Sequence, residues 1–237
     1  MLRITPTVKQ LLILNIIVFA GTYLMGNEDV FYRLLALFYP MSNYFGFWQL
    51  ISHMFMHGNF QHLLFNMFAL WMFGTAVEQV FGQRKFLTFY ISCGLGAVAL
   101  TFLVYFIQIY PSISDLETQG FSFEMIKEIT RLNILENNMF KGELLAQKMQ
   151  PILESHGKNQ IDASTFRMFF DLNVRSNGSM VGASGAIFGL LVAFGMLNPN
   201  AELLLIFLPI PIKAKYFVPG IIAIDLFSAV SGVSVFS

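Results

Sequence analysis

Apolar positions come in long blocks along this chain, and polar positions gather in the segments between them. A helix that crosses a membrane needs about 20 mostly apolar residues. Four stretches approach that length and a fifth begins near the end of the chain. They cover residues 8–25, 60–81, 86–110, about 182–197, and 216 onward. The pattern therefore predicts an all-α fold, a polytopic helical membrane bundle.

Two further segments interrupt this pattern. Residues 203–212 are apolar but contain Pro209 and Pro211, which oppose a continuous helix, so we expect a re-entrant or interfacial segment. Residues 109–180 form a polar insertion between the third and fourth spans. Helical periodicity runs through 123–154, and 162–170 is expected to be a short helix capped by Asp162. We expect a small helical cap outside the membrane, within a single membrane domain covering 1–237.

Composition points to the same class of protein. The chain is 56% hydrophobic and only 12% charged, whereas soluble domains carry about 25% charged residues. The insertion holds 16 of the 28 charged residues, so the remainder cannot form a water-soluble surface. This excludes a soluble enzyme, a disordered chain and a basic nucleic-acid binder. The lipid bilayer is the implied partner, and nucleic acid is not.

Basic residues predict the orientation. With a cytoplasmic N-terminus, the inner side holds six basic residues, at positions 3, 9, 84, 85, 213 and 215, while the short outer loop holds only Arg33. The insertion is too long for its charges to decide the orientation. We therefore expect the N-terminus inside and the insertion outside, in a bacterial inner membrane, since no organelle-targeting signal is evident.

Polar side chains at membrane depth are costly and are either functional or mutually satisfied. His62 and Asn66 are four residues apart, so they share one helix face near the outer end of the second span. Interhelical hydrogen bonding and a functional role are equally good interpretations of this pair alone. Glu78 lies at the inner end, where capping or bonding to a neighbouring helix is the better interpretation.

The fourth span opens with Gly182-Ala-Ser184-Gly185, and Gly185 and Gly189 form a small-residue face suited to close packing. In the assigned topology the second and fourth spans run in the same direction, which brings Ser184 to the depth of His62 and Asn66. A serine nucleophile needs donors for the oxyanion it generates. The His62 ring, the Asn66 amide and the Ser184 backbone N–H are suitable donors.

These residues resemble the rhomboid family of intramembrane serine proteases. The resemblance rests on His53, His57, His62 and Asn66, on Gly74-Thr-Ala-Val-Glu78, and on Gly182-Ala-Ser184-Gly185. It implies a six-helix bundle that cleaves transmembrane protein substrates, with Ser184 as nucleophile and His62 and Asn66 in the oxyanion hole. It also implies that His57 helps to hold the first outer loop and that His53 lies near the substrate entrance. That loop often carries Trp-Arg in the family, but here it reads Trp48-Gln49.

One expected element is missing. Rhomboid proteases take their general base from a histidine on a sixth helix, but the four histidines here are His53, His57, His62 and His156. Three belong to the second-helix motif and His156 lies in the insertion. We therefore expect a C-terminally truncated chain with five of the six core helices. An unactivated serine is a weak nucleophile, so this chain should be nearly inactive.

Two alternatives remain. A catalytically inactive rhomboid-like protein that binds transmembrane clients would explain the missing base, but not the joint presence of Ser184, His62 and Asn66. A transporter or channel subunit would explain polar residues in the membrane, but it lacks the paired acidic residues or charge rings of ion pathways. No metal or cofactor motif is evident, because the spacing of His57 and His62 is not that of helical zinc sites.

Overall fold

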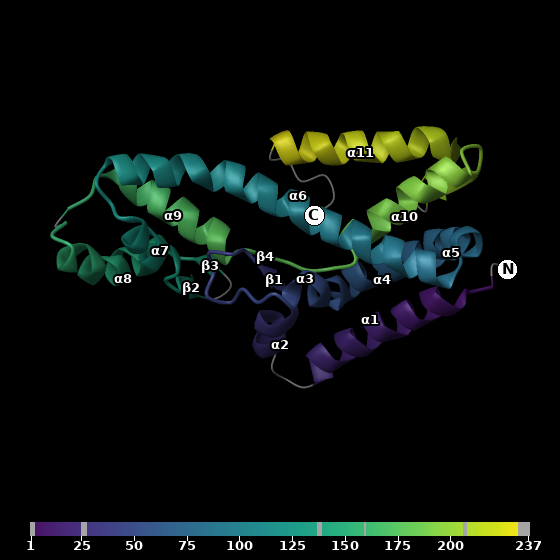
Figure 1. Cartoon of the computed structure of the whole chain (residues 1–237), viewed down its shortest axis with the longest axis horizontal. Helices are drawn as coiled ribbons and strands as arrows, with labels where there is room; N and C mark the ends of the chain where they lie inside the picture. Colours follow the sequence, from purple (N-terminus) through teal and green to yellow (C-terminus); the bar gives the residue numbers. More distant parts are fainter. Residues whose placement is uncertain (1–2, 25–27, 137–138, 159, 206–207, 232–237) are drawn as a thin grey trace. The chain divides into compact units, whose positions relative to one another are not determined.

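A computed structural model describes residues 3–24, 28–136, 139–158, 160–205 and 208–231 of the chain (Figure 1). The fold is mostly helical, which confirms the expected class. The helices are α1 (Pro6–Leu24), α2 (Glu28–Leu35), α3 (Gln49–Ser52), α4 (Phe60–Ala69), α5 (Thr75–Phe81), α6 (Gln83–Thr118), α7 (Phe123–Thr130), α8 (Gly142–Ser155), α9 (Ala163–Asn177), α10 (Ser184–Leu197) and α11 (Ala214–Ser231). A 3₁₀ turn, η1 (His53–Phe55), follows α3, and a π-helical turn, η2 (Leu70–Gly74), joins α4 to α5.

The described strands form short antiparallel pairs. β1 (Leu37–Phe38) pairs with β4 (Ser179–Met180), and β2 (Leu135–Glu136) pairs with β3 (Met139–Phe140). β5 (Glu202–Leu205) pairs with β6 (Leu208–Lys213), so the segment expected to be re-entrant or interfacial is a β-hairpin. Pro209 and Pro211 exclude a helix there, and a hairpin satisfies backbone groups that a helix would leave unpaired. An interfacial position of this hairpin stays a prediction.

Three helical segments in the described part of the chain are long and apolar enough to cross a membrane. They are Pro6–Leu24, the continuous α4–η2–α5 segment Phe60–Phe81, and Gln83–Thr118. The first two match the expected spans closely, whereas α6 extends eight residues past the predicted end of the third span and contains Pro111. The apolar helices Ser184–Leu197 and Ala214–Ile224 are shorter. The protein is therefore a helical membrane protein.

The chain divides into two compact units, and α1 and α6 each contribute to both. Unit 1 comprises Met1–Ala20, His57–Gly96 and Gly182–Ser237, and it contains the whole predicted active-site motif except His53. Unit 2 comprises Gly21–Met56 and Ala97–Val181, which include most of the first outer loop, the insertion, and the ends of α1 and α6 that adjoin them.

In unit 1, α10 packs against the second span and against the helices that flank it. The Phe73 and Phe194 ring centroids are 5.2 Å apart. A Cβ added at Gly189 would collide with the sulfur of Cys93 on α6, so the predicted small-residue face is used for close packing. A Cβ at Gly195 would lie 2.8 Å from Val218 of α11, next to α10 in Figure 1. Glycines therefore bring α10 close to two neighbouring helices.

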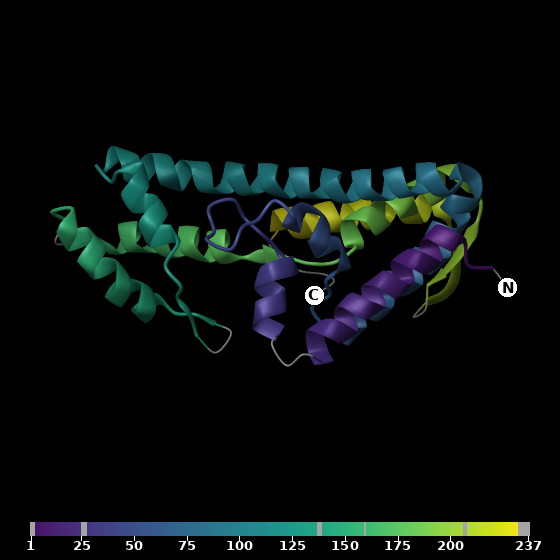
Figure 2. The ribbon, with the colours of Figure 1, turned by 60° about the horizontal axis from the view of Figure 1, so that its bottom comes forward.

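Unit 2 has a hydrophobic core of its own. Figures 1 and 2 show α7 and α9 beside the C-terminal part of α6, with α8 beyond them. The core is formed by residues from these four helices and the segments between them, namely Tyr105, Ile109, Leu116, Phe121, Met125, Ile126, Ile129, Ile134, Leu145, Met149, Leu153, Phe169 and Leu172. The insertion is thus a folded body that buries apolar side chains, and not only a polar loop.

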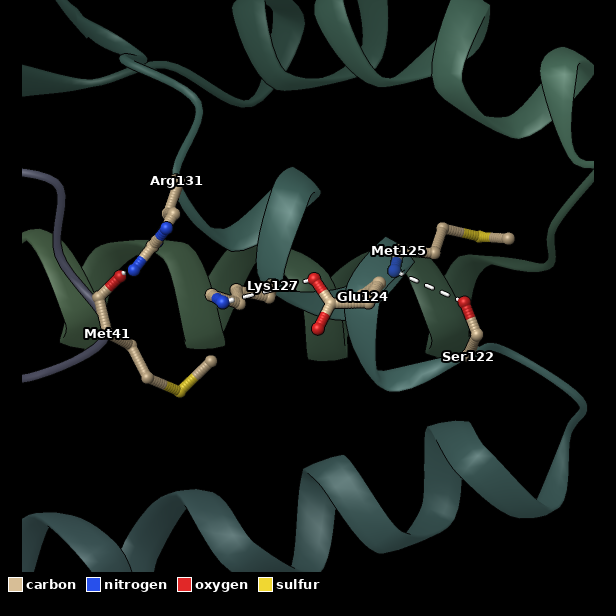
Figure 3. Close-up of polar contacts among 6 residues, drawn as sticks. All are labelled: Met41, Ser122, Glu124, Met125, Lys127 and Arg131. Atoms are coloured by element: carbon tan, nitrogen blue, oxygen red, sulfur yellow. Dashed lines mark hydrogen bonds and ion pairs between the residues drawn. The ribbon is translucent and has the colours of Figure 1, made fainter.

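Local signals explain the helix boundaries in the insertion. The Ser122 hydroxyl accepts a hydrogen bond from the Met125 N–H at the start of α7 (Figure 3). Asp162 caps α9 as predicted, accepting from the Thr165 N–H at 2.7 Å, although α9 continues to Asn177. The expectation of helix throughout 123–154 was wrong, because the β2–β3 hairpin separates α7 from α8. Asn133 and Gly142 flank this hairpin, and both residue types favour turns and helix ends.

Candidate active site

The second span places its two polar residues on one buried face. The Asn59 side chain caps α4 by accepting a hydrogen bond from the His62 N–H at 2.8 Å. His62 and Asn66 follow one turn apart; Asn66 is only 7% exposed, and His62 is partly buried. The spacing in the sequence had predicted this shared face.

Gly182 brings the other half of the motif to this face. Its φ of 111° is accessible essentially to glycine alone. A Cβ at this position would lie 2.8 Å from Cε1 and Nε2 of His62, and 3.6 Å from Nδ2 of Asn66. The backbone of the Gly182-Ala-Ser184-Gly185 motif therefore lies directly against the His62 and Asn66 side chains.

Ser184 begins α10 two residues later. The contact of Gly182 with α4 and the contact of Phe194 with Phe73 show that α10 and the second span run parallel, as the predicted topology required. Ser184 is exposed, and no side chain caps the first turn of α10. The free backbone N–H groups of this turn carry a partial positive charge. Oxyanion stabilisation by the three predicted donors stays a proposal.

Asn66 has an unused donor. Its Nδ2 atom is buried and makes no hydrogen bond to any residue that the structure describes. Buried amides are rarely left in this state, because an unpaired buried donor costs about 1–3 kcal/mol. This amide next to Gly182 is available to an oxygen atom of a ligand.

Comparisons with known proteins bear on this motif. Residues 44–109 match the Rhomboid domain. This segment of the chain is therefore similar to the rhomboid family. The matched residues include His53 through Glu78 but not the Ser184 motif. The chain is also similar to the rhomboid protease GluP of Bacillus subtilis (strain 168), with 42% identity over 53 residues. This similarity covers 22% of the chain and 10% of that protein.

Two other members of the rhomboid motif lie in unit 1. His57 is 2% exposed, and its ring packs edge-on against His62 with 5.1 Å between the centroids. This contact restricts the orientation of the His62 ring. Gly185, the other glycine next to Ser184, is partly buried at the start of α10.

Glu78 bonds the neighbouring helix, as expected for a structural residue. Its carboxylate accepts hydrogen bonds from the Thr7 N–H at 3.0 Å, the Val8 N–H at 2.9 Å and the Thr5 hydroxyl at 2.5 Å. The carboxylate thus satisfies the first free N–H groups of α1 and complements the partial positive charge of that helix end. Glu78 therefore joins α1 to α5.

Gln49 organises the first outer loop within unit 2. Fully buried, its amide oxygen accepts from the backbone N–H groups of Phe38 and Gly46, and its amide nitrogen donates to the carbonyls of Arg33 and Tyr44. The sequence does not predict this role, and the resemblance indicates only that rhomboids often carry arginine here. A neutral amide can accept and donate at once, which a guanidinium cannot.

The remaining histidines belong to unit 2. His53 is 3% exposed, and its Nδ1 lies 2.7 Å from the Gln49 carbonyl oxygen. Burial lowers the pKa of His53, and hydrogen bonds to the backbone of Gln49 and Leu50 oppose this effect. His156 lies at the end of α8, 2.9 Å from the Ile152 carbonyl oxygen. In the described part of the chain, no group of three His, Cys, Asp or Glu side chains is arranged to hold a metal ion.

Proposed function

We propose that this protein is an intramembrane serine endopeptidase that cleaves transmembrane segments of other membrane proteins. The observation that supports this most strongly is the contact of Gly182 with His62 and Asn66. It places a helix that begins at a serine beside an unpaired amide donor and an imidazole. Packing alone does not account for this combination, since packing is better served by apolar groups.

In the proposed reaction, the Ser184 Oγ attacks the carbonyl carbon of the scissile peptide bond. The Asn66 amide, the His62 ring and the Ser184 backbone N–H donate hydrogen bonds to the oxyanion, and the N-terminal charge of α10 adds to this stabilisation. Departure of the amine leaves an acyl-enzyme, which water then hydrolyses. We assign the general base to none of the chain's four histidines.

The proposal includes an orientation. With the N-terminus in the cytoplasm, the active site opens toward the outer face and the insertion lies outside the membrane. Six basic residues on the inner side against one in the short outer loop support this arrangement. Substrates would be transmembrane proteins of the same membrane, and a bacterial cell membrane is the proposed location.

The test is cleavage of a model transmembrane substrate in proteoliposomes by the product of the natural gene. We expect Ser184→Ala to abolish cleavage and Ser114→Ala, in the insertion, to leave it unchanged. Failure of the natural product to show Ser184-dependent cleavage would falsify the proposed activity.

An inactive protein that binds transmembrane clients is the second candidate. The absence of an assigned base among the four histidines favours it. It predicts that a photo-crosslinking transmembrane peptide attaches near Ser184 and is never cleaved, and that a fluorophosphonate probe does not label Ser184. Labelling of Ser184 in the natural product but not in Ser184→Ala supports the protease instead.

A further inference from the structure

Unit 2 contains a cavity that has no part in the proposed reaction. It lies between the first outer loop and α7, and its volume of about 470 Å³ is in the range of small-molecule sites. The residues that line it are Asn43, Glu124, Lys127, Glu128, Arg131 and Leu132. Most of these side chains are charged, so the cavity suits a charged ligand better than an apolar one.

The charged side chains form two neighbouring rows on one face of α7. Lys127 and Arg131 are four residues apart, which places them one helical turn apart. Glu124 and Glu128 have the same spacing. Figure 3 shows Lys127 between Arg131 and Glu124. A row of positive charge therefore runs beside a row of negative charge along the cavity.

These charges do not neutralise one another through close contacts. The Lys127 Nζ is 3.9 Å from Oε2 of Glu124, whose side chain is 81% exposed. An ion pair of this kind contributes little, so a ligand can replace it. Among the residues that the structure describes, Glu128 forms no ion pair. Both rows are thus available to opposite charges of a ligand.

Hydrogen bonds hold the basic row in place before any ligand binds. The Arg131 Nε donates to the Met41 carbonyl at 2.9 Å (Figure 3), and the Asn43 Nδ2 donates to the Arg131 carbonyl at 3.3 Å. Leu132 packs against the hydrophobic core of unit 2. With Nε engaged, the two Nη groups of Arg131 remain as donors. The loop and the end of α7 therefore form a preorganised site, which lowers the cost of binding.

The balance of charge identifies the class of ligand. A simple anion would be attracted by two cations and repelled by two carboxylates, whereas a zwitterion gains from both rows. We propose that this cavity binds a zwitterion of the phosphoethanolamine class. Its phosphate contacts Lys127 and the Nη groups of Arg131, since a guanidinium fork matches phosphate oxygens. Its ammonium group lies against the two glutamates.

The separation of the two charges favours this class over an α-amino acid. Residues three and four apart on a helix surface are about 5–6 Å from one another. A two-carbon linker lets a phosphate and an ammonium reach both rows, whereas the two charges of an α-amino acid share one carbon. The ligand is either the headgroup of a membrane lipid or its water-soluble counterpart. The site belongs to unit 2, so the proposal stands whether or not the protein is a protease.

The test is calorimetric titration of the full chain in maltoside micelles with dihexanoyl phosphatidylethanolamine. Lys127→Gln and Glu128→Gln should each weaken binding by about three- to tenfold, because each removes one charged contact. Lys141→Gln and Glu117→Gln remove the same charges outside the cavity and should leave binding unchanged. All four positions are exposed or half-buried, so the fold should be kept.

The glutamate variant decides between a zwitterion site and an anion site. If Glu128→Gln binds the lipid as tightly as the wild type or more tightly, the cavity attracts only negative charge and the proposal is overturned. Absence of saturable binding, or equal weakening by the control variants, overturns it too. Dihexanoyl phosphatidylglycerol keeps the phosphate but lacks the ammonium, so its binding should be at least about threefold weaker. Equal binding of the two lipids contradicts the proposal.

A second titration distinguishes the two sources of the ligand. Glycerophosphoethanolamine carries the same headgroup without acyl chains. If it binds as tightly as the lipid, the headgroup alone is recognised and the ligand is a soluble zwitterion. If the lipid binds about tenfold tighter or more, and both glutamine variants weaken it, the ligand is a phospholipid of the bilayer.

Discussion

At the scale of single residues, Gly182 is the most tightly constrained position in the motif. It combines a positive φ with a contact that leaves no space for a side chain. The two requirements are independent, because the first concerns the residue's own backbone and the second concerns the ring of His62. No other residue type satisfies both, so the distance between the Ser184 motif and the second span depends on this glycine.

We predict that Gly182→Ala separates the two halves of the motif. It should cost about 1–3 kcal/mol of the free energy of unfolding through backbone strain, and it should displace the His62 ring. Differential scanning fluorimetry and fluorophosphonate labelling of the natural gene product would measure both effects. Gly96→Ala is the control, because a Cβ there meets nothing within 4 Å. A Gly182→Ala protein with wild-type stability and labelling would contradict this account.

Residue spacing predicted some of these features but not others. The four-residue interval predicted that His62 and Asn66 share a face, because helix geometry is local. The unused Asn66 donor and the four hydrogen bonds of Gln49 were not predictable, since the first depends on the absence of a partner and the second on how an irregular loop folds around one side chain.

At the scale of elements, the apolar blocks predicted the first two spans to within two residues. Predictions failed where apolar periodicity continued through turn-forming residues. Leu132, Ile134 and Leu135 fit a helical repeat, yet they lie between α7 and α8, because Asn133 and Gly142 are residue types that favour turns and helix ends. The π-helical turn η2 was also not predicted, since its apolar residues fit a regular helix equally well.

The junction of α1 and α5 gives a prediction at this scale. Glu78→Ala should destabilise unit 1 by about 1–3 kcal/mol, because two N–H groups at the start of α1 lose their acceptor. Hydrogen exchange should accelerate at Thr7 and Val8. Gln79→Ala, at the exposed neighbouring position, should change neither stability nor exchange. If both variants behaved alike, the carboxylate would not hold the helix end.

At the scale of the whole molecule, the insertion and the first outer loop form one unit, although 40 residues separate the two segments of that unit in the sequence. The strand pairing of Leu37 with Met180 and the stacking of Tyr39 on Tyr105, with centroids 4.2 Å apart, join them. The sequence predicts only an added cap here, because non-local strand pairing leaves no periodic signal. Within this unit, β1 of the first outer loop pairs with β4, so the loop fixes the backbone at the end of the insertion.

Arg131 tests this coupling. It follows α7 in the insertion, and its Nε donates to the Met41 carbonyl of the first outer loop at 2.9 Å (Figure 3). A charged donor of this kind is worth about 1.5–3 kcal/mol, so Arg131→Ala should open the loop locally and speed hydrogen exchange in residues 39–45 by about tenfold or more. Arg167→Ala removes an equal charge from an exposed position on α9 and should leave that exchange unchanged. If hydrogen exchange in the loop accelerates in both variants, the change in net charge is the cause. If it accelerates in Arg131→Ala alone, the insertion holds the loop.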